Sequence, residues 1–212
     1  MAELDKLGIN LKRCTYKTLK CLKKSSIYGD AISVDYNSEK QKIHISNDAK
    51  KEFKTDRLES LFEQNNIKTV EFENLGRDVK KATCISSTCS IICSRLIMEC
   101  LKKTPFLKVK NILYRKMGVN IKNVDAIIIA PNVLIDYIYP ELVFIGSGTI
   151  IGEEAILTTH YFTPSKFVIG YISIGNDCLI RARSIVLPGM NIKDNSFVGV
   201  NTVITKYIDS NS

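Results

Sequence analysis

The C-terminal half of the chain carries a bulky apolar residue at every sixth position, and this period constrains the fold more than any other feature. The positions form two runs of seven, and thirteen of the fourteen residues are Ile, Val or Leu. A period of six fits neither the 3.6-residue repeat of a helix nor the two-residue alternation of a strand. The runs are Ile121, Ile127, Val133, Tyr139, Ile145, Ile151 and Leu157, then Val168, Ile174, Ile180, Val186, Ile192, Val198 and Ile204.

This period is typical of a chain that turns a corner every six residues and points one aliphatic side chain inward on each side. Three sides close one turn of a triangular coil, and stacked turns give three parallel sheets around an aliphatic interior. An Ile-rich β-sandwich is the alternative, but its turns would not keep a six-residue period through fourteen steps. Small residues at the tight positions agree with the coil: Gly146, Thr149, Gly152, Ala155, Gly175, Cys178, Ser184, Ser196, Gly199 and Thr202.

The two runs are out of phase, because 11 residues instead of 12 separate Leu157 from Val168. We therefore expect a loop to leave the coil at this point. One of the two histidines of the chain, His160, lies in the interrupted segment.

The sequence before the repeat has a different character. Residues 1–105 are predicted to form a smaller, basic α+β domain, and residues 106–212 to form the repeat domain. Spacing and turn signals predict the following elements in order: a basic amphipathic helix over 4–24, a hairpin of 31–36 and 42–46, a helix capped by Asn47 or Asp48 and running to about Asn65, a strand over 67–72, a helix over 77–103, and a short helix over 106–117.

Charge divides the chain in the same way. Lys and Arg outnumber Asp and Glu by 30 to 22, which gives a net charge of +8. Residues 1–120 hold 24 basic and 14 acidic side chains, and residues 121–212 hold 6 and 8. The excess favours anionic partners such as nucleic acid, a membrane surface or a phosphorylated cofactor, and it lies outside the repeat.

Targeting and redox signals point to the cytoplasm. The N-terminus has no continuous apolar segment of the kind a secretory signal needs, and the longest apolar runs are too short to span a bilayer. Seven cysteines are an odd set. Without an export signal we expect them to be reduced thiols.

The segments VFIGSGTIIGEEAILTTH, ISIGNDCLIRARSIVLPGMNI and NSFVGVNTVITKYI resemble the hexapeptide-repeat acyltransferases. The maltose, galactoside and serine O-acetyltransferases and their xenobiotic relatives are the most similar branch, over about residues 106–209. The resemblance implies a left-handed parallel β-helix, an exception to the usual right-handed crossover. It also implies a homotrimer with active sites between adjacent coils.

Members of this family transfer an acyl group, usually acetyl, from coenzyme A to a hydroxyl or amine of a small molecule. An alcohol needs a base to remove its proton at neutral pH, and imidazole titrates in the right range. The matching residue is His160, after the Thr-Thr pair. The alternative is a surface histidine without a catalytic role.

Other roles carry over residue by residue. Asp136 matches the position of an Asn or Asp that lines the acceptor pocket, although a solvated corner residue is an equal alternative. The coenzyme lies in a groove between coils and is held largely by backbone groups. Lys206 could pair with a coenzyme phosphate or be an ordinary exposed lysine. The positions matching the coenzyme groove are Arg181, Ala182, Val200, Thr205 and Lys206.

Two departures from the family pattern leave the acceptor open. Relatives often have Trp-Ile-Gly where this chain has Leu179-Ile180-Arg181. Arg181 therefore obstructs the groove, binds a phosphate together with Arg183, or faces another subunit. The loop after His160 is also shorter than in many relatives. Neither acceptor size nor the choice between O- and N-acylation follows from the sequence.

No metal is expected from the sequence. The γ-class carbonic anhydrases place zinc on the same coil with three histidines, whereas this coil offers only His160. Four cysteines at Cys84, Cys89, Cys93 and Cys100 lack paired C-x-x-C spacing and fit one face of a helix, where we expect them to be small buried hydrophobic residues.

A second hypothesis belongs to a different class of protein. Residues 67–86 faintly resemble Alba-type nucleic-acid-binding proteins, and the charge of the N-terminal half is compatible with phosphate contacts. The chain would then be a non-catalytic trimeric scaffold that binds nucleic acid or another acidic partner. The simpler interpretation is that residues 1–105 cap the first coil.

Overall fold

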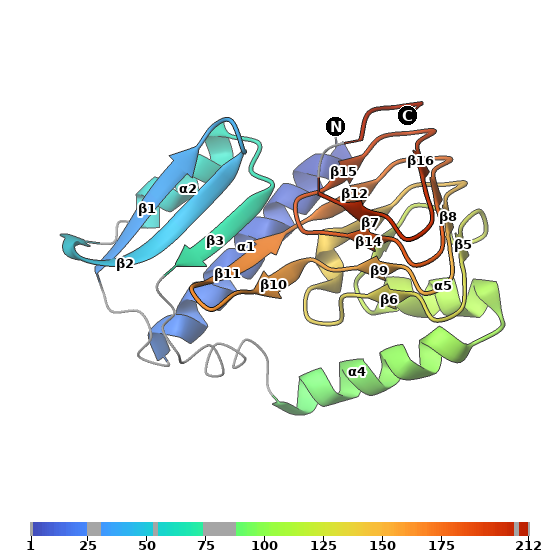
Figure 1. The fold of residues 1–212 in the computed structure, drawn as a ribbon. Helices are drawn as coiled ribbons and strands as arrows, with labels where there is room; N and C mark the ends of the chain where they lie inside the picture. The colour runs from blue at the N-terminus through green and yellow to red at the C-terminus, as the bar shows by residue number, and fades with distance from the viewer. Residues whose placement is uncertain (1, 25–30, 53–54, 74–87, 206–207, 212) are drawn as a thin grey trace. The chain divides into compact units, whose positions relative to one another are not determined.

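The computed structural model of the chain describes residues 2–24, 31–52, 55–73, 88–205 and 208–211 (Figure 1). They form two compact units, which are described separately below. The first comprises Met1–Thr88 with His160–Gly170, and the second comprises Cys89–Thr159 with Tyr171–Ser212. A segment from inside the repeat region therefore belongs to the N-terminal unit.

Three parallel sheets of four short strands make up most of the second unit. Consecutive strands belong to different sheets, and strands one turn apart pair in parallel, so the chain winds as a parallel β-helix, as predicted. In spatial order the sheets are β15 (Asn191–Ile192), β12 (Ile172–Ile174), β7 (Val143–Ile145) and β4 (Asn120–Ile121); β16 (Phe197–Val198), β13 (Leu179–Ile180), β8 (Ile150–Ile151) and β5 (Ile128–Ile129); and β17 (Val203–Ile204), β14 (Ile185–Val186), β9 (Ile156–Leu157) and β6 (Leu134–Ile135).

Stacked aliphatic side chains fill the interior of the coil. In one sheet Ile145, Ile174 and Ile192 are register partners, and in the next Ile151, Ile180 and Val198 are. Leu157, Val186 and Ile204 form the third column. All nine are at most 3% exposed, as a six-residue period requires.

The predicted period is wrong in the first turn and at one later position. The residues that pair with the columns above are Ile121, Ile129 and Ile135, because the first side of the coil is two residues longer than the usual six. A 3-10 turn, η3 (Pro140–Leu142), then restores the phase. Ile127, Val133 and Tyr139 are buried but are not register partners of the columns, and Val168 lies in a strand of the first unit.

Small residues at the corners allow successive turns to approach closely. The Thr149 hydroxyl donates to the Gly175 carbonyl of the next turn at 2.7 Å, and the Ser184 hydroxyl donates to the Gly199 carbonyl at 2.9 Å. These small side chains therefore fit at the tight corners and also link successive turns by hydrogen bonds. Thr202, in the last turn, is exposed, whereas the other predicted small positions at Thr149, Ala155, Cys178, Ser184 and Ser196 are buried.

Two helices close the open end of the coil. Met98 and Leu101 of α4 (Thr88–Lys103) belong to the same hydrophobic core as the columns. The buried side chains of α5 (Leu107–Lys116) donate to carbonyls of the first turn: Lys110 to Ile129 and Ala130, Asn111 to Val124 and Ile127, and Tyr114 to Val133. The end turn has no further strand to pair with, so α5 satisfies its carbonyls instead.

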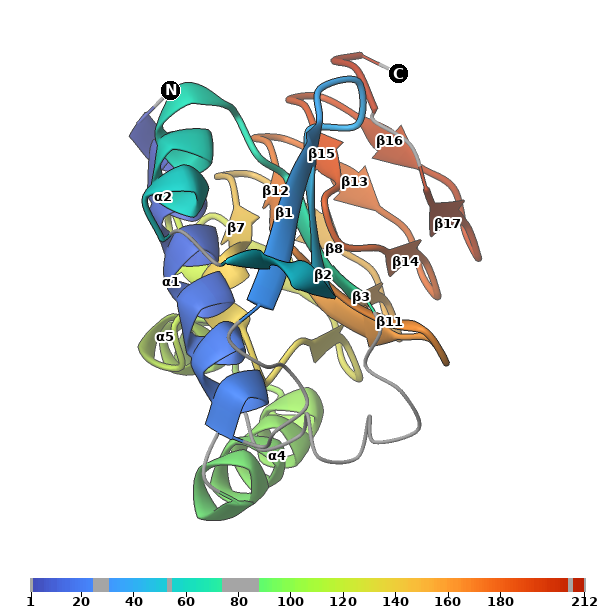
Figure 2. The same cartoon turned by 90° about the vertical axis from the view of Figure 1, so that its left-hand side faces the viewer.

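The first unit is a five-stranded mixed sheet with two helices over one face (Figure 2). Strands β2 and β3 are parallel, and the other neighbours are antiparallel. The order is β1 (Ala31–Asn37), β2 (Lys42–Glu52), β3 (Thr69–Glu73), β11 (Lys166–Gly170) and β10 (His160–Phe162), and the helices are α1 (Ala2–Lys24) and α2 (Thr55–Gln64). The predicted α+β character of the N-terminal half is confirmed.

Helix α1 is amphipathic and basic, as predicted. Leu7, Leu11 and Cys14 are buried, while Arg13 and Lys17 are exposed. Each helix in the described part of the chain is too short or too polar to span a membrane.

The predicted start of the second helix is wrong. Asn47 and Asp48 lie within β2, which continues to Glu52, and the helix begins at Thr55. The register shifts between Ala31 and Ile32, and Ala31 pairs with Glu52 at the end of this extension. Backbone pairing thus overrides a local capping preference. Of the predicted helix over 77–103, the part before residue 88 lies outside the described residues.

Gly152→Ala is expected to destabilise the coil by about 1–3 kcal/mol, as other overpacked sites do. A Cβ on Gly152 would lie 2.5 Å from the backbone nitrogen of Ala182 in the next turn, so backbone would have to move. Gly199→Ala is the matched control, because its Cβ would meet only the Thr202 hydroxyl at 3.3 Å. Urea unfolding of the two variants tests this, and equal losses would contradict the close approach.

Candidate active site

His160 is the first residue of the strand that leaves the coil. Strand β9 ends at Leu157, and after two further residues β10 and β11 form an antiparallel hairpin in which His160 pairs with Ile169. This hairpin is the predicted excursion. The imidazole is half-buried and meets the rings of Phe162 and Phe167 edge-on, both with centroids 5.9 Å away. Two stacked aromatic rings, 4.2 Å apart, thus flank the candidate base.

The hairpin is part of a sheet built by the N-terminal half of the sequence. Strand β11 pairs antiparallel with β3, so that Phe167 lies opposite Phe72 and Lys166 opposite Glu73. The two phenyl rings stack with centroids 6.1 Å apart. The sequence did not predict this pairing, because β3 and β11 are almost a hundred residues apart. The N-terminal half therefore supports the strand next to the one that carries His160.

Asp136 is a buried carboxylate that anchors the residue preceding His160. One oxygen accepts hydrogen bonds from the Thr159 backbone N–H at 2.9 Å and from the Thr159 hydroxyl at 2.7 Å. The other accepts from the backbone N–H groups of Ile138 and Tyr139 at 2.8 and 3.3 Å. Asp136 is 5% exposed, so the alternative of a solvated corner residue is wrong. Four donors occupy its two oxygens and hold the end of the coil where the hairpin begins.

The residues predicted to bind coenzyme A lie at corners of the last two turns. Ala182 and Val200 follow β13 and β16, and Asn201 donates its backbone N–H to the Ala182 carbonyl at 2.9 Å. Val200 and Arg181 are exposed. Thr205 is exposed after β17, at the following corner, and Lys206 lies outside the described residues.

The two arginines near this corner have different surroundings. The Arg183 guanidinium pairs with Glu154 at 2.7 Å, and this hydrogen bond raises its pKa. The Arg181 guanidinium lies 5.8 Å from the centre of the Phe197 ring, within cation–π range. Arg183 already has a carboxylate partner, so Arg181 is the better candidate to meet a phosphate.

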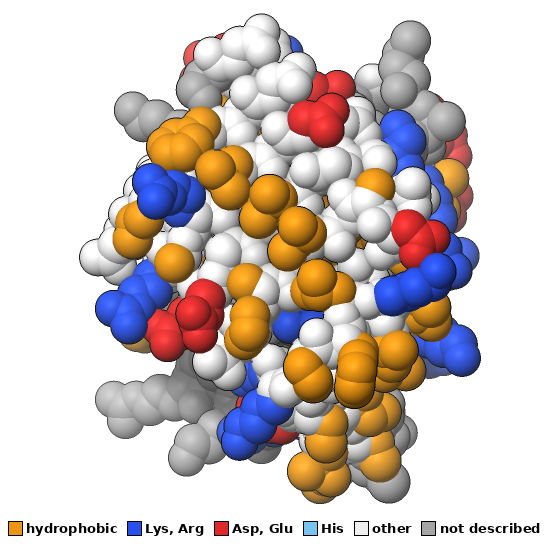
Figure 3. All heavy atoms as spheres, turned by 90° about the vertical axis from the view of Figure 1, so that its right-hand side faces the viewer, with side chains coloured by type: hydrophobic (Ala, Val, Ile, Leu, Met, Phe, Trp, Pro, Cys, Tyr) orange, Lys and Arg blue, Asp and Glu red, His pale blue; other side chains and the backbone are white. Residues whose placement is uncertain are grey.

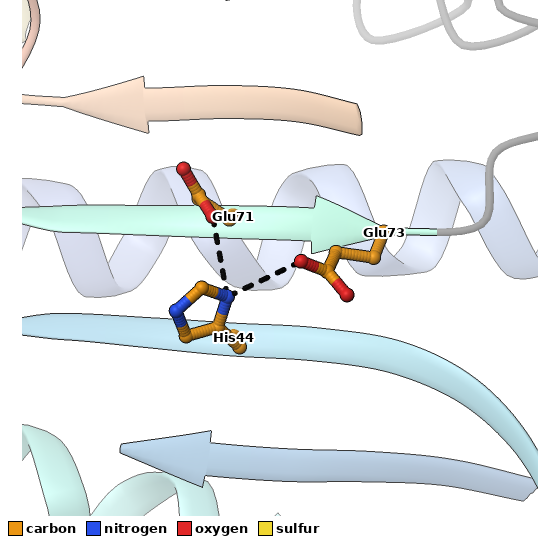
Figure 4. A group of neighbouring side chains, drawn as sticks. All are labelled: His44, Glu71 and Glu73. Carbon is orange, nitrogen blue, oxygen red and sulfur yellow. Dashed lines mark ion pairs between the residues drawn. The ribbon is translucent and has the colours of Figure 1, made fainter. Parts of the chain in front are cut away.

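A second polar cluster, which the sequence did not predict, lies on the sheet of the first unit. Glu71 is 1% exposed and pairs with Lys42 and with Lys166, the latter at 3.2 Å. Burial alone would raise the pKa of Glu71, but the two lysines together lower it. His44 and Glu73 complete the group (Figure 4). The alternation of apolar and polar residues in KIHIS and TVEFE places the polar side chains of each strand on one face. It does not reveal that the two strands pair, so the cluster could not be predicted from the sequence.

The prediction that the cysteines of this helix are buried is wrong for the two whose side chains the structure describes. Cys93 and Cys100 are exposed free thiols on α4. Cys84 and the side chain of Cys89 lie outside what the structure describes.

A hollow of about 620 Å³ also lies in the first unit, between α1 and the segment that joins α2 to β3. Lys12 and Glu63 pair across it at 3.6 Å. None of the predicted site residues lines this hollow, so we do not assign the acyl-transfer reaction to it.

Comparisons with known proteins identify the class to which this chain belongs. No protein-family profile matches it. "Putative acetyltransferase SAS0727" of Staphylococcus aureus (strain MSSA476) is 37% identical over 117 residues, which cover 55% of this chain and 71% of that protein. Because the chain folds as a hexapeptide coil and is similar to this relative over 71% of its length, it belongs to the hexapeptide-repeat acyltransferases.

Two further similarities complete the comparison. "Putative acetyltransferase YvoF" of Bacillus subtilis (strain 168) is 30% identical over 114 residues, 52% of this chain and 64% of that protein, so the chain spans just under two thirds of this relative. The solved structure of a maltose O-acetyltransferase from Clostridium difficile 630 is 18% identical, with a TM-score of 0.46 over 58% of this chain and 80% of that one. None of these names supports a nucleic-acid partner.

Asp136→Ala is expected to lower the free energy of unfolding by about 1–3 kcal/mol or more, because buried N–H groups at Thr159 and Ile138 would lose their acceptor. Thr159→Ser keeps both donors to Asp136 and should stay close to wild type. Denaturant unfolding of both variants is the measurement. An Asp136→Ala protein as stable as Thr159→Ser would show that the carboxylate does not anchor this corner.

Proposed function

We propose that this protein transfers an acetyl group from acetyl-coenzyme A to a hydroxyl or amine of a small molecule, with His160 as the general base. The observation that carries the proposal is the position of His160, directly after the corner that buried Asp136 anchors. A base must be held within hydrogen-bond reach of the proton it removes, and a rigid coil end is a suitable support.

The chemistry assigned to His160 is proton transfer in both directions. The neutral imidazole takes the proton of the acceptor as its oxygen or nitrogen attacks the thioester carbonyl. The carbon–sulfur bond then breaks, and the imidazolium returns the proton to the coenzyme A thiolate. No metal is needed for these steps.

Asp136 acts in this proposal through Thr159. Its two oxygens already accept four hydrogen bonds from the chain, which favours a positioning role over direct contact with the acceptor. A carboxylate also suits this place better than an amide, because donors face both oxygens and the NH2 group of an amide could not accept from them. In this proposal, the acceptor makes its polar contacts with groups other than Asp136.

Coenzyme A is proposed to bind along the corners of the last turns, in the repeat domain of residues 106–212. Backbone groups of Ala182, Val200 and Thr205 would form hydrogen bonds with the amides of the pantetheine. Because backbone groups make these bonds, the identity of the side chains matters little. Arg181 and Lys206 would meet phosphate groups. The exposed guanidinium over Phe197 is free to reorient toward an anion without breaking an ion pair described in this unit.

A homotrimer is the proposed assembly. The cytoplasm is the proposed location. Ile128, Ile150, Leu179 and Phe197 are neighbours across one sheet and point out of the coil. Ile128, Ile150 and Phe197 are 43%, 39% and 51% exposed. Hydrophobic side chains form a band across this face of the molecule (Figure 3). An exposed apolar band of this kind is typical of a protein interface, and other copies of the same coil are the occupants we propose.

His160→Ala should lower kcat for acetyl transfer by at least about 100-fold, the contribution of a positioned base. Thiol release from acetyl-coenzyme A, measured with a panel of hydroxylated and amino acceptors, is the assay. Coenzyme binding measured by calorimetry should be unchanged and serves as the control for folding. Full activity of His160→Ala would exclude this residue as the base.

The same panel separates the two classes of function. If wild-type protein neither bound acetyl-coenzyme A nor acetylated any acceptor, the enzymatic proposal would fail. Salt-dependent retention of the full chain on nucleic acid would then favour the scaffold hypothesis.

Ile150→Glu is expected to convert the trimer into monomers, because a charge would be buried in the apolar band. Lys116→Gln, at an exposed position on α5, is the matched control, because it also lowers the charge by one unit. Light scattering coupled to size-exclusion chromatography gives the mass of each. A monomeric wild type would refute the assembly, and a trimeric Ile150→Glu would exclude this face.

A further inference from the structure

Three ligand-type side chains meet on the sheet of the first unit, and they come from two parallel strands. The register of β2 and β3 pairs His44 with Glu71, and Glu73 lies two residues further along the same face. The His44 Nδ1 atom lies 3.2 Å from Glu71 Oε2 and 3.4 Å from Glu73 Oε1. Figure 4 shows both carboxylates directed at this nitrogen. The three donor atoms lie within 4.8 Å of one another.

The two oxygens of the buried Glu71 carboxylate have different surroundings. Lys42 and Lys166 both pair with Oε1. Oε2 is buried and accepts no hydrogen bond from any residue that the structure describes. Such an atom costs free energy unless something binds it. The polar atom it faces is His44 Nδ1, which is an ion-pair partner only when the imidazole is protonated. That nitrogen can carry one proton at most and faces two carboxylate oxygens.

A cation at the centre of the group would satisfy all three atoms at once. One imidazole nitrogen with two carboxylate oxygens is a donor set that suits Zn²⁺ and similar divalent transition metals better than Mg²⁺ or Ca²⁺, which prefer oxygen alone. His44 and Glu73 are 33% and 43% exposed, so an ion has access from solvent and could keep water at an open position. Lys42 and Lys166 offset the charge of the two carboxylates, so binding must come from coordination and not from net negative charge.

From this geometry we propose that His44, Glu71 and Glu73 form a binding site for a divalent transition metal ion, with Zn²⁺ the best suited. The site is separate from the proposed acyl transfer and does not depend on it. Its ligands join β2 to β3, and β3 in turn pairs with β11, so bound metal would strengthen the sheet that includes the hairpin of His160. No metal was expected from the sequence, because the coil has a single histidine and the cysteines lack paired spacing.

The test begins with full-length protein treated with a chelator and then dialysed free of it. Calorimetric titration with ZnCl₂ should show one ion per chain, and saturating Zn²⁺ should raise the melting temperature by mass action. His44→Ala and Glu73→Gln should each abolish both effects. Glu73→Gln keeps the shape of a half-exposed side chain, so it tests the ligand without removing buried volume.

Control variants exclude other zinc ligands. His160→Ala and the double variant Cys93→Ser/Cys100→Ser should bind as wild type does. Co²⁺ substituted at the site should give visible d–d bands without a thiolate-to-metal charge-transfer band. The proposal is overturned if wild type binds no Zn²⁺, if His44→Ala and Glu73→Gln bind it unchanged, or if the Co²⁺ spectrum shows thiolate ligation.

Discussion

Stacking of aliphatic side chains between successive turns is the interaction on which the rest of this structure depends. A single turn of six-residue sides cannot bury its own inward residues, because each side contributes only one. Ile151 is buried only when Ile129 and Ile180 lie on either side of it. The corners then have to be narrow enough for turns to approach, which is why glycine and small hydroxyl residues occupy them.

The ends and interruptions of such a stack need a physical solution of their own. At the first turn, α5 supplies donors from Lys110, Asn111 and Tyr114 to carbonyls that have no neighbouring strand. At the interruption, Asp136 holds Thr159 and thereby sets the point from which the chain departs. The chain then adds two strands to a different sheet. His160 is the first residue of this departing strand.

The N-terminal half consequently has a clearer structural role than its charge implied. It supplies β3, the strand that pairs with the hairpin, and its polar face contains a buried carboxylate held by two lysines. The positive charge noticed in the sequence is partly engaged in these ion pairs and partly exposed along α1. Net charge alone therefore says little about the partner of this half.

The sequence by itself determined the coil, because a six-residue period is a local pattern that each turn repeats. It also identified His160 and the site of the excursion, since both follow from a break in that pattern and from the family resemblance. It failed at Ile127, Val133 and Tyr139, which are as apolar as true column positions, and at Val168, which belongs to another sheet. Only the tertiary structure decided that Asp136 binds Thr159, that β11 pairs with β3, and that His44 faces Glu71 and Glu73. Each of these contacts joins residues more than twenty positions apart, and no local periodicity specifies which distant strand or corner will be the neighbour.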